Sequence, residues 1–211
     1  MKKIYRKSGV HTFCKAKHPY EPFNIKNAQT LIIGNTPPSR FVTKKLQDGD
    51  VDWYYGSRHN AFWKLLQESC NAPKALDTKE IQQQFFLDNN IGIFDTIEEC
   101  SRKEGCGASD GELFNIVLVD VLAILKENLE QKLKVFFSSR FVAELFQKAT
   151  NVKFDLRSRE MQKVELDSKL LEVTILYSPS PSWARGLSEE IRKDPEKNQL
   201  RLKQYSKICN N

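Results

Sequence analysis

Two short segments carry the side chains best suited to chemistry. The first, residues 34–39, reads Gly-Asn-Thr-Pro-Pro-Ser and follows a short apolar run. Gly34 lets a ligand approach the backbone, and Pro37 stiffens the loop by fixing φ. Asn35 and Thr36 add polar groups beside the glycine. A loop of this kind is also typical of an ordinary proline-stiffened turn between a strand and a helix. It therefore indicates a functional site only when other segments support it.

The second segment, residues 54–63, mixes aromatic, basic and amide side chains directly before a helical pattern. Such a mixture suits stacking on a nucleic-acid base and hydrogen bonding to its edge. Tyr55 and Asn60 are the candidates for those two tasks. Phe62 and Trp63 recur at helical spacing, which favours the helix core over a role as a base platform.

Amide side chains can support a reaction without acting as strong bases. The carbonyl oxygen of an Asn can orient a water, and its amide can donate to an oxygen of a bound group. A site built on Asn60 and Asn35 would therefore rely on positioning and on leaving-group stabilisation.

Short apolar runs predict the buried strands that position these segments. Each run is followed by a helical pattern, which is typical of an α/β sheet with mainly parallel strands. In such sheets, ligands bind beyond the carboxyl ends of the strands. The predicted strands cover residues 30–33, 133–137 and 171–177, and their helical patterns include Phe62, Leu65 and Leu66, then Phe141, Leu145 and Phe146, then Leu187 and Ile191.

Further helices are predicted over residues 79–87, 95–101 and 115–129. Asp95 and Asp110 can face the pocket or cap helix starts, and for Asp95 we favour the cap of the second of these helices. The segment from 103 to 111 is too rich in glycine to continue a helix. No repeat, linker or composition break divides the chain, so we expect a single domain over residues 1–211.

Composition narrows the class of protein. The 211 residues are 40% hydrophobic and 28% charged, a normal globular balance, and the net charge of +6 favours polyanionic partners without identifying them. No apolar run is long enough for a membrane span, and the basic start lacks the apolar stretch of a secretory signal. We therefore expect a cytoplasmic protein that binds no membrane.

The cysteines and histidines argue against a metal site. Five cysteines are an odd number, which favours reduced thiols in a chain without an export signal. They form no C-x-x-C pair. His11, Cys14 and His18 lie close in sequence but lack a fourth ligand at suitable spacing, so we expect no metal.

Taken together, the segments resemble the uracil-DNA glycosylase superfamily, and most closely its hypoxanthine-DNA glycosylase branch. Residues 18–22, His-Pro-Tyr-Glu-Pro, are similar to that branch's His-Pro-x-x-Pro lead-in, and residues 31–34 are similar to its Leu-Ile-Leu-Gly strand. The resemblance runs in the family's order from residue 18 to about residue 184. Its other matches are Tyr54-Tyr55, Asn60-Ala61-Phe62-Trp63, Gly92-Ile93-Phe94-Asp95, the spaced Arg102, Gly105, Ser109 and Asp110, and Ser178-Pro179-Ser180-Pro181-Ser182.

The resemblance implies a central, mainly parallel four-stranded sheet flanked by helices, with a flipped base held in a pocket. It gives Asn60 a catalytic role and leaves the share of Asn35 open, because the first loop departs from the branch's Gly-Ser-x-Pro-Ser. Without C-x-x-C pairs the chain lacks the iron-sulfur cluster of some branches, and we expect no cofactor. The base pocket is expected from Gly34, Thr36, Pro37, Tyr55 and His59, and the DNA contacts from Ser39, Arg58, Ser178, Ser180 and Ser182.

The implied function is a monofunctional DNA glycosylase that removes hypoxanthine or uracil in base-excision repair and acts as a monomer. Arg58-His59 stands where the branch has Pro-Arg, and His59 either donates to the base anion or a phosphate, or faces solvent. Trp183 is either a wedge in the DNA or, as we prefer, an anchor for the last helix.

Two other functions stay open. A DNA- or modified-base-binding protein of the same fold would explain the altered first loop. A nucleotide-binding α/β protein would use the Gly34 loop for phosphate, but the several glycines or the Gly-Lys-Ser/Thr ending of such loops are absent.

Overall fold

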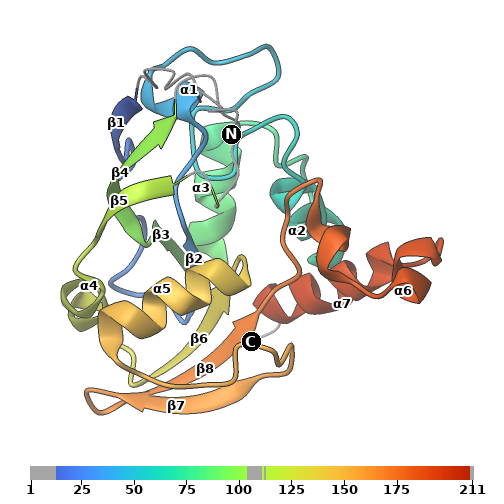
Figure 1. Ribbon diagram of the computed structural model, residues 1–211. Helices are drawn as coiled ribbons and strands as arrows, with labels where there is room; N and C mark the ends of the chain where they lie inside the picture. The colour runs from blue at the N-terminus through green and yellow to red at the C-terminus, as the bar shows by residue number, and fades with distance from the viewer. Residues whose placement is uncertain (1–12, 104–110, 112, 210–211) are drawn as a thin grey trace, which may run out of the picture.

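The computed structural model describes residues 13–103, 111 and 113–209. The main sheet has five strands in the order β3-β2-β6-β8-β7 (Figure 1). Four of them are parallel neighbours, as the sequence predicts, but the expectation of a four-stranded sheet is wrong because an antiparallel fifth strand forms one edge. The strands are β2 (Thr30–Gly34), β3 (Ile91–Asp95), β6 (Lys132–Phe137), β7 (Gln162–Leu166) and β8 (Lys169–Ile175).

The edge strand β7 forms a hairpin with β8. The two turn residues, Asp167 and Ser168, have φ angles of 47° and 67°. Positive φ at both central residues suits the two-residue turns that match the twist of a hairpin. Asp-Ser is a weaker turn signal than Asn-Gly, which is why the hairpin is hard to see in the sequence.

A second, antiparallel sheet of three strands has the order β1-β4-β5. It replaces part of two predicted helices, over residues 95–101 and 115–129. Thr96 and Ile97 are β-branched and favour a strand, and the backbone N–H of Thr96 donates to the carbonyl of Gly34. The strands are β1 (Phe13–Lys17), β4 (Ile97–Lys103) and β5 (Leu113–Leu118).

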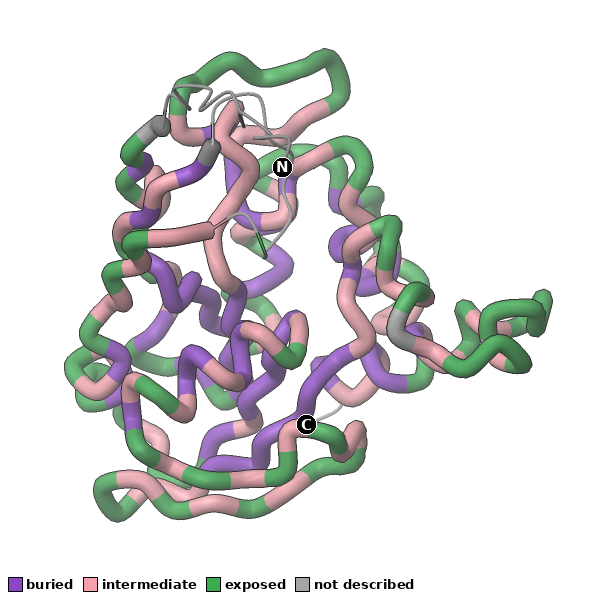
Figure 2. The backbone as a smooth tube through the Cα atoms, in the orientation of Figure 1, coloured by how far each residue is buried: buried purple, intermediate pink, exposed green. Residues whose placement is uncertain are grey.

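Helices cover both faces of the main sheet (Figure 1). Leu31 and Ile33 of β2 pack with α4 (Val121–Glu127) and α5 (Arg140–Thr150) on one face. Ile32 points to the other face and packs with a second group of helices. Strands β2 and β3 are entirely buried and β6 and β8 are largely buried, whereas the edge strand β7 is not (Figure 2). The second group comprises α2 (Phe62–Ser69), α3 (Lys79–Asp88) and α7 (Asn198–Cys209), and the short helices are α1 (Ser39–Val42), η2 (Trp183–Gly186) and α6 (Glu189–Lys193).

The last helix, α7, has no counterpart in the sequence prediction. Its buried positions recur at helical spacing but include Arg201 and Gln204 beside Tyr205 and Ile208. Gln204 is satisfied there because its Oε1 accepts from the backbone N–H of Tyr177 at 2.6 Å. Polar residues on the inner face hide the amphipathic pattern.

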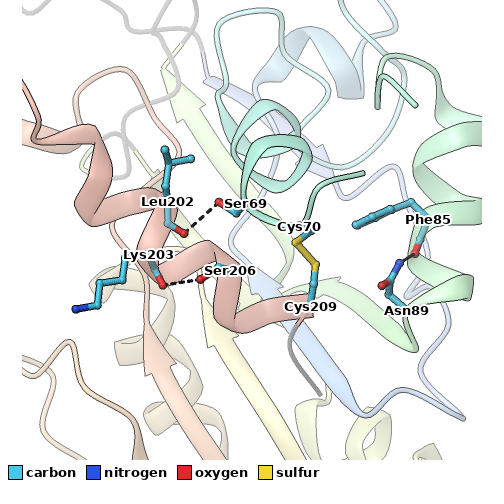
Figure 3. Close-up of a disulfide and its surroundings, with 8 residues drawn as sticks. All are labelled: Ser69, Cys70, Phe85, Asn89, Leu202, Lys203, Ser206 and Cys209. Atoms are coloured by element: carbon cyan, nitrogen blue, oxygen red, sulfur yellow. Dashed lines mark hydrogen bonds between the residues drawn. A yellow bond between two sulfur atoms is a disulfide. The ribbon is translucent and has the colours of Figure 1, made fainter. Parts of the chain in front are cut away.

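A disulfide joins Cys70, directly after α2, to Cys209 at the end of α7 (Figure 3). The expectation of reduced thiols is therefore wrong for this pair. Ser69 adds a hydrogen bond from its hydroxyl to the carbonyl of Leu202, at 3.1 Å. Cys100 is a buried free thiol. Together the disulfide and this hydrogen bond hold α2 against α7.

Several residues of the predicted patterns lie outside the described part of the chain. They include His11, Gly105, Cys106, Ser109 and Asp110, as does the side chain of Cys14. Within the described residues, no helix combines the length and the apolar character that a membrane span requires.

Candidate active site

A cleft of about 1020 Å³ opens beyond the carboxyl ends of the parallel strands. The segments that follow β2, β6 and β8 all contribute to its walls, as the parallel topology requires. The residues at the strand ends that line it are Asn35, Thr36, Pro37 and Pro38 after β2, Asp95 at the end of β3, Ser138 and Ser139 after β6, and residues 178–182 after β8.

Gly34 makes room for two side chains of the cleft. A Cβ at this position would collide with the carboxylate of Asp95 and would lie 2.6 Å from the hydroxyl of Tyr55. Gly34 and Asp95 are register partners on neighbouring strands. Because Gly34 has no side chain, Asp95 and Tyr55 can lie close to its backbone. Gly34 does not itself line the cleft.

The loop after Gly34 is held from several sides. The side-chain oxygen of Asn35 accepts from the backbone N–H of Thr36 at 2.7 Å, and its backbone carbonyl accepts from Ile97 at 3.1 Å. The buried guanidinium of Arg102 donates to the carbonyl of Pro37 at 3.2 Å. The loop is thus a fixed wall of the cleft.

Tyr55 lines the cleft in a strained backbone conformation. Its φ of 53° is rare for a bulky residue, and such strain persists where the surroundings over-determine it. Its ring stacks on Phe62, with ring centroids 4.1 Å apart and an interplanar angle of 20°. Phe62 and Trp63 are buried, which confirms the prediction that they belong to the helix core.

Asn60 lies just before α2 and lines the cleft. Its Oδ1 accepts from the backbone N–H of Phe62 at 2.9 Å, so the amide is oriented by the start of the helix. The backbone of Ala61 donates to the carbonyl of Pro179 at 3.0 Å and joins this segment to the loop after β8. With Oδ1 engaged, Asn60 offers N–H donors to a ligand in the cleft.

Arg40 and Asp50 form a clamp beside the cleft. The Nε of Arg40 lies 2.6 Å from Oδ2 of Asp50, and its Nη2 donates to Oδ1 at 3.0 Å and to the Ser57 hydroxyl at 2.7 Å. The hydrogen bond from Arg40, together with those from the backbone of Arg58 and Gln47, holds the pKa of Asp50 well below its usual range. This paired fork fixes α1 relative to the Tyr55 segment.

His18 and Asp95 form a second buried ion pair. Their side chains are 7% and 8% exposed, and Nε2 of His18 lies 2.8 Å from Oδ2 of Asp95. Nδ1 lies 2.8 Å from the carbonyl of Tyr20, a contact that suits a protonated ring nitrogen. Burial disfavours the charged imidazole, but the hydrogen bond and charge of Asp95 outweigh it and raise the pKa of His18 above 6.5. Asp95 does not cap a helix, so that expectation is wrong.

The loop after β8 is shaped by its own serines. The hydroxyl of Ser178 accepts from the backbone of Ser180, and the hydroxyl of Ser180 accepts from the backbone of Ser182, at 3.2 and 3.3 Å. Trp183 packs edge-on against Tyr177 and beneath the guanidinium of Arg201, which lies 4.8 Å from its ring centre. Trp183 thus ties the loop to α7.

The structure brings most of the predicted site residues together, but three lie outside the cleft walls. Gly34 lies behind Asp95, Ser39 starts α1, and Arg58 is exposed at the side, where its Nη1 donates to the carbonyl of Asp48 at 3.1 Å. His59 lines the cleft but is exposed, and it accepts from Arg58. The predicted residues in the walls are Asn35, Asn60, Thr36, Pro37, Tyr55, His59, Ser178, Ser180 and Ser182.

Sequence reasoning missed the roles of His18, Asp95 and Arg40. His18 and Asp95 stand 77 positions apart, and the pairing of β1 with β4 brings them together, because His18 follows β1 and Asp95 precedes β4. The His-Pro lead-in and the Asp at the end of an apolar run were the available signals.

Basic residues gather on the side of the cleft formed by η2 and α6. Arg185, Arg192 and Lys197 line the cleft, and the α6 segment projects from the body of the protein as an exposed arm (Figures 1 and 2). Their charges favour a polyanion at this edge. Among the residues that the structure describes, no group of three His, Cys, Asp or Glu side chains is placed to hold a metal ion.

Comparisons with known proteins give a match in structure alone. Neither protein-family models nor curated protein sequences match this chain. A solution NMR structure from Methanosarcina acetivorans, of a protein described as a candidate uracil-DNA glycosylase, has a TM-score of 0.56 and 16% sequence identity. The match covers 93% of this chain and 96% of that chain. The chain is therefore similar in fold to that protein over nearly its whole length.

Proposed function

We propose that this protein is a monofunctional DNA glycosylase, which hydrolyses the N-glycosidic bond of hypoxanthine or uracil flipped out of DNA. The observation that carries the proposal is the cleft itself. It joins the two amides Asn35 and Asn60, the aromatic ring of Tyr55 and the serine-rich loop after β8 at the carboxyl ends of parallel strands. The shared fold with the Methanosarcina acetivorans protein supports the same reading.

The size and walls of the cleft suit a flipped nucleotide. At about 1020 Å³ it is larger than a single base needs, so it can also admit the sugar and its phosphates. Tyr55 offers an aromatic edge and face to a base, and its ring is held by stacking on Phe62. The base would enter beside Asn35 and Asn60.

In the proposed reaction, the C1′–N bond breaks with its electron pair on the base, and a water oxygen bonds to C1′. The proton that the water loses ends on the base. Asn60 assists by donating its amide N–H to the oxygen of the base as negative charge grows there, because its own Oδ1 is already held by Phe62. Asn35 and the neighbouring loop position the sugar and the water.

The DNA backbone would lie along the outer part of the cleft. Ser178, Ser180 and Ser182 have short hydroxyls that approach phosphates closely, and the prolines between them restrict the loop. Arg185, Arg192 and Lys197 add positive charge on one side. In this proposal the whole chain acts as one domain and as a monomer, without a cofactor, in base-excision repair.

The experiment is a lesion panel on purified protein. Labelled duplex and single-stranded oligonucleotides with hypoxanthine, uracil or xanthine are incubated with protein and then treated with alkali, which cleaves at abasic sites. We expect cleavage of at least one lesion by the wild type and a loss of activity in Asn60→Ala that exceeds the loss in Asn35→Ala. Inactivity across the panel would refute the proposal.

A binding protein of the same fold is the second candidate. The observation that favours it is that the side-chain oxygens of both amides already accept from backbone N–H groups, which leaves water activation to other groups. Tight binding of a lesion without turnover, unchanged in Asn60→Ala, would favour this candidate over the enzyme.

A further inference from the structure

Helix α7 packs against residues 55–70, which comprise the cleft residues before α2 and α2 itself and are called the α2 wall below. The ring of Tyr205, which is fully buried, lies 6.0 Å from the ring of Phe62. Phe62 in turn stacks on Tyr55, which lines the cleft. A shift of α7 away from α2 would therefore remove the support behind both of these rings.

The same helix also holds the serine-rich loop after β8. The Oε1 of Gln204 accepts from the backbone N–H of Tyr177 at 2.6 Å, and the hydroxyl of Tyr205 donates to the carbonyl of Tyr177 at 3.3 Å. Tyr177 directly precedes the loop. The guanidinium of Arg201 lies 4.8 Å from the ring centre of Trp183, which follows the loop. Contacts at both ends of the loop thus come from one helix, α7.

The inner face of α7 is partly polar, which limits its apolar packing. Arg201 and Gln204 are buried there, at 5% and 6% exposure. Among the described residues, Nε and Nη2 of Arg201 have no hydrogen-bond partner, and burial lowers the pKa of this guanidinium. Burying such a group is costly, and the apolar side chains that α7 buries are those of Tyr205 and Ile208. The covalent bond at the end of α7 is therefore a major part of its attachment.

This covalent bond lies in the last turn of α7. Cys209 ends the helix and is joined to Cys70, which follows α2 (Figure 3). Helix ends open more readily than helix centres, and the disulfide prevents such opening at the end of α7 that lies on α2. Both cysteines of the bond are partly exposed, whereas the free thiol of Cys100 is buried. A reductant can therefore reach the bond from solvent.

We propose that the Cys70–Cys209 disulfide is a redox switch that acts on the cleft through α7. With the bond closed, α7 holds the α2 wall and the loop after β8 in the arrangement that binds a damaged base. With the bond open, the end of α7 separates from α2, and both walls lose support. The proposal rests on the function proposed above for the cleft, to which it adds regulation.

The switching step is thiol–disulfide exchange with a dithiol. One thiolate of the dithiol attacks one sulfur of the pair and forms a mixed disulfide, and the other cysteine leaves as a thiolate that takes up a proton. The second thiol of the dithiol then displaces the remaining cysteine. Two electrons pass to the protein, which ends with two thiols, while the reductant ends as a disulfide.

The test compares lesion affinity in the two redox states. Fluorescence anisotropy is measured with a labelled duplex whose hypoxanthine or uracil carries a 2′-fluoro sugar that resists cleavage, before and after treatment of the protein with dithiothreitol. We expect reduction to weaken binding by about fivefold or more. Cys209→Ser should bind like the reduced wild type in both conditions, and Cys100→Ala should respond as the wild type does. A wild type that binds the lesion equally tightly in both states would overturn the proposal.

A variant of α7 separates the switch from a general loss of stability. Gln204→Leu removes the hydrogen bond to Tyr177 while the disulfide stays closed. We expect the oxidised variant to bind the lesion about fivefold or more weakly, and reduction to weaken binding by less than about twofold further, because both changes act along one route. Gln199→Leu, at an exposed position of the same helix, should keep the wild-type affinity and redox response. A full redox response in Gln204→Leu would overturn the route through α7.

Hydrogen exchange tests the switch without DNA. The backbone N–H of Tyr177 donates to Gln204, and that of Ala61 donates to Pro179 in the loop after β8. We expect both amides to exchange faster after reduction, while the amides of β2 keep their rates and show that the reduced protein stays folded. Faster exchange in a protein that binds neither lesion would support the switch and refute the glycosylase function. Unchanged exchange at both amides would refute the switch, whatever the protein binds.

Discussion

The Nε2 atom of His18 lies 2.8 Å from Oδ2 of Asp95, which links the segment after β1 to the end of β3 inside the cleft wall. Both side chains of this ion pair are less than a tenth exposed. His18 thereby holds the carboxylate of Asp95, which lies next to Gly34 at the ends of β3 and β2.

The free energy of unfolding should depend on pH because of the His18–Asp95 pair. Because the pKa of His18 in the folded protein lies above its ordinary 6.5, protonation favours the folded state. This contribution is present in full below about pH 6.5 and is lost as the pH rises through the folded-state pKa. We expect the free energy of unfolding of the wild type to exceed that of His18→Gln by more at about pH 6 than at about pH 9. Urea titrations at both pH values measure the two gaps, and equal gaps would contradict the assignment.

Gly34→Ala should displace side chains that line the cleft. The new Cβ would collide with the Asp95 carboxylate and crowd the Tyr55 hydroxyl, so one of the two must move. We expect a loss of about 1–3 kcal/mol in the free energy of unfolding, as for other overpacked positions, together with reduced lesion binding. Gly49→Ala, at an exposed turn with a φ of 78°, is a control that strains the backbone without touching the cleft wall. Wild-type lesion binding by Gly34→Ala would contradict the role given to this glycine.

The disulfide between Cys70 and Cys209 should stabilise the fold substantially. It spans a sequence separation of 139 residues and ties α2 to the C-terminal helix (Figure 3). Removing a native disulfide typically costs about 2–5 kcal/mol, and we expect a loss in this range for Cys209→Ser in denaturant titration. Reductant should lower the stability of the wild type to that of the variant and leave the variant unchanged. Equal stability of the oxidised wild type and Cys209→Ser would contradict this prediction.

Binding of DNA should depend on the basic side of the cleft. If Arg192 and Lys197 contact phosphates, each alanine variant should reduce the slope of log affinity against log salt concentration by about 0.9. Lys163, exposed on the edge strand β7, is the control, and its alanine variant should keep the wild-type slope. Titrations of a labelled duplex at several salt concentrations provide the slopes. Unchanged slopes for Arg192→Ala and Lys197→Ala would place the DNA elsewhere.

The part of the fold that follows from local patterns was predictable. The apolar runs of β2, β6 and β8 and the helical spacing in α2, α3 and α5 are visible in the sequence, and the parallel arrangement brings the loops after the strands together. The helix predicted over residues 95–101 is instead β4, because pairing with β1 and β5 in an antiparallel sheet outweighs the helical pattern.

The site was predictable where one short segment carries the residues, and hidden where two distant segments meet. Asn35 and Asn60 stand in the two segments whose residue types suggested a site, and both line the cleft. His18 and Asp95, which stand 77 positions apart, meet through the pairing of β1 with β4. The orientation of the Asn60 amide likewise depends on the backbone of Phe62, which composition does not reveal.

The proposed glycosylase function is tested most directly by the release of free base from a hypoxanthine or uracil duplex. The wild type and Asn60→Asp are compared under single-turnover conditions. Aspartate keeps an oxygen that accepts from Phe62, so the start of α2 is preserved. It lacks the amide N–H donors and adds a negative charge, and both changes oppose the departing base anion. We predict base release by the wild type and a fall in rate of about 100-fold or more in Asn60→Asp. Asn27→Asp, at an exposed position, should match the wild type. A folded wild-type protein that releases neither base would refute the glycosylase function, and an Asn60→Asp variant that releases base at the wild-type rate would refute the role of Asn60.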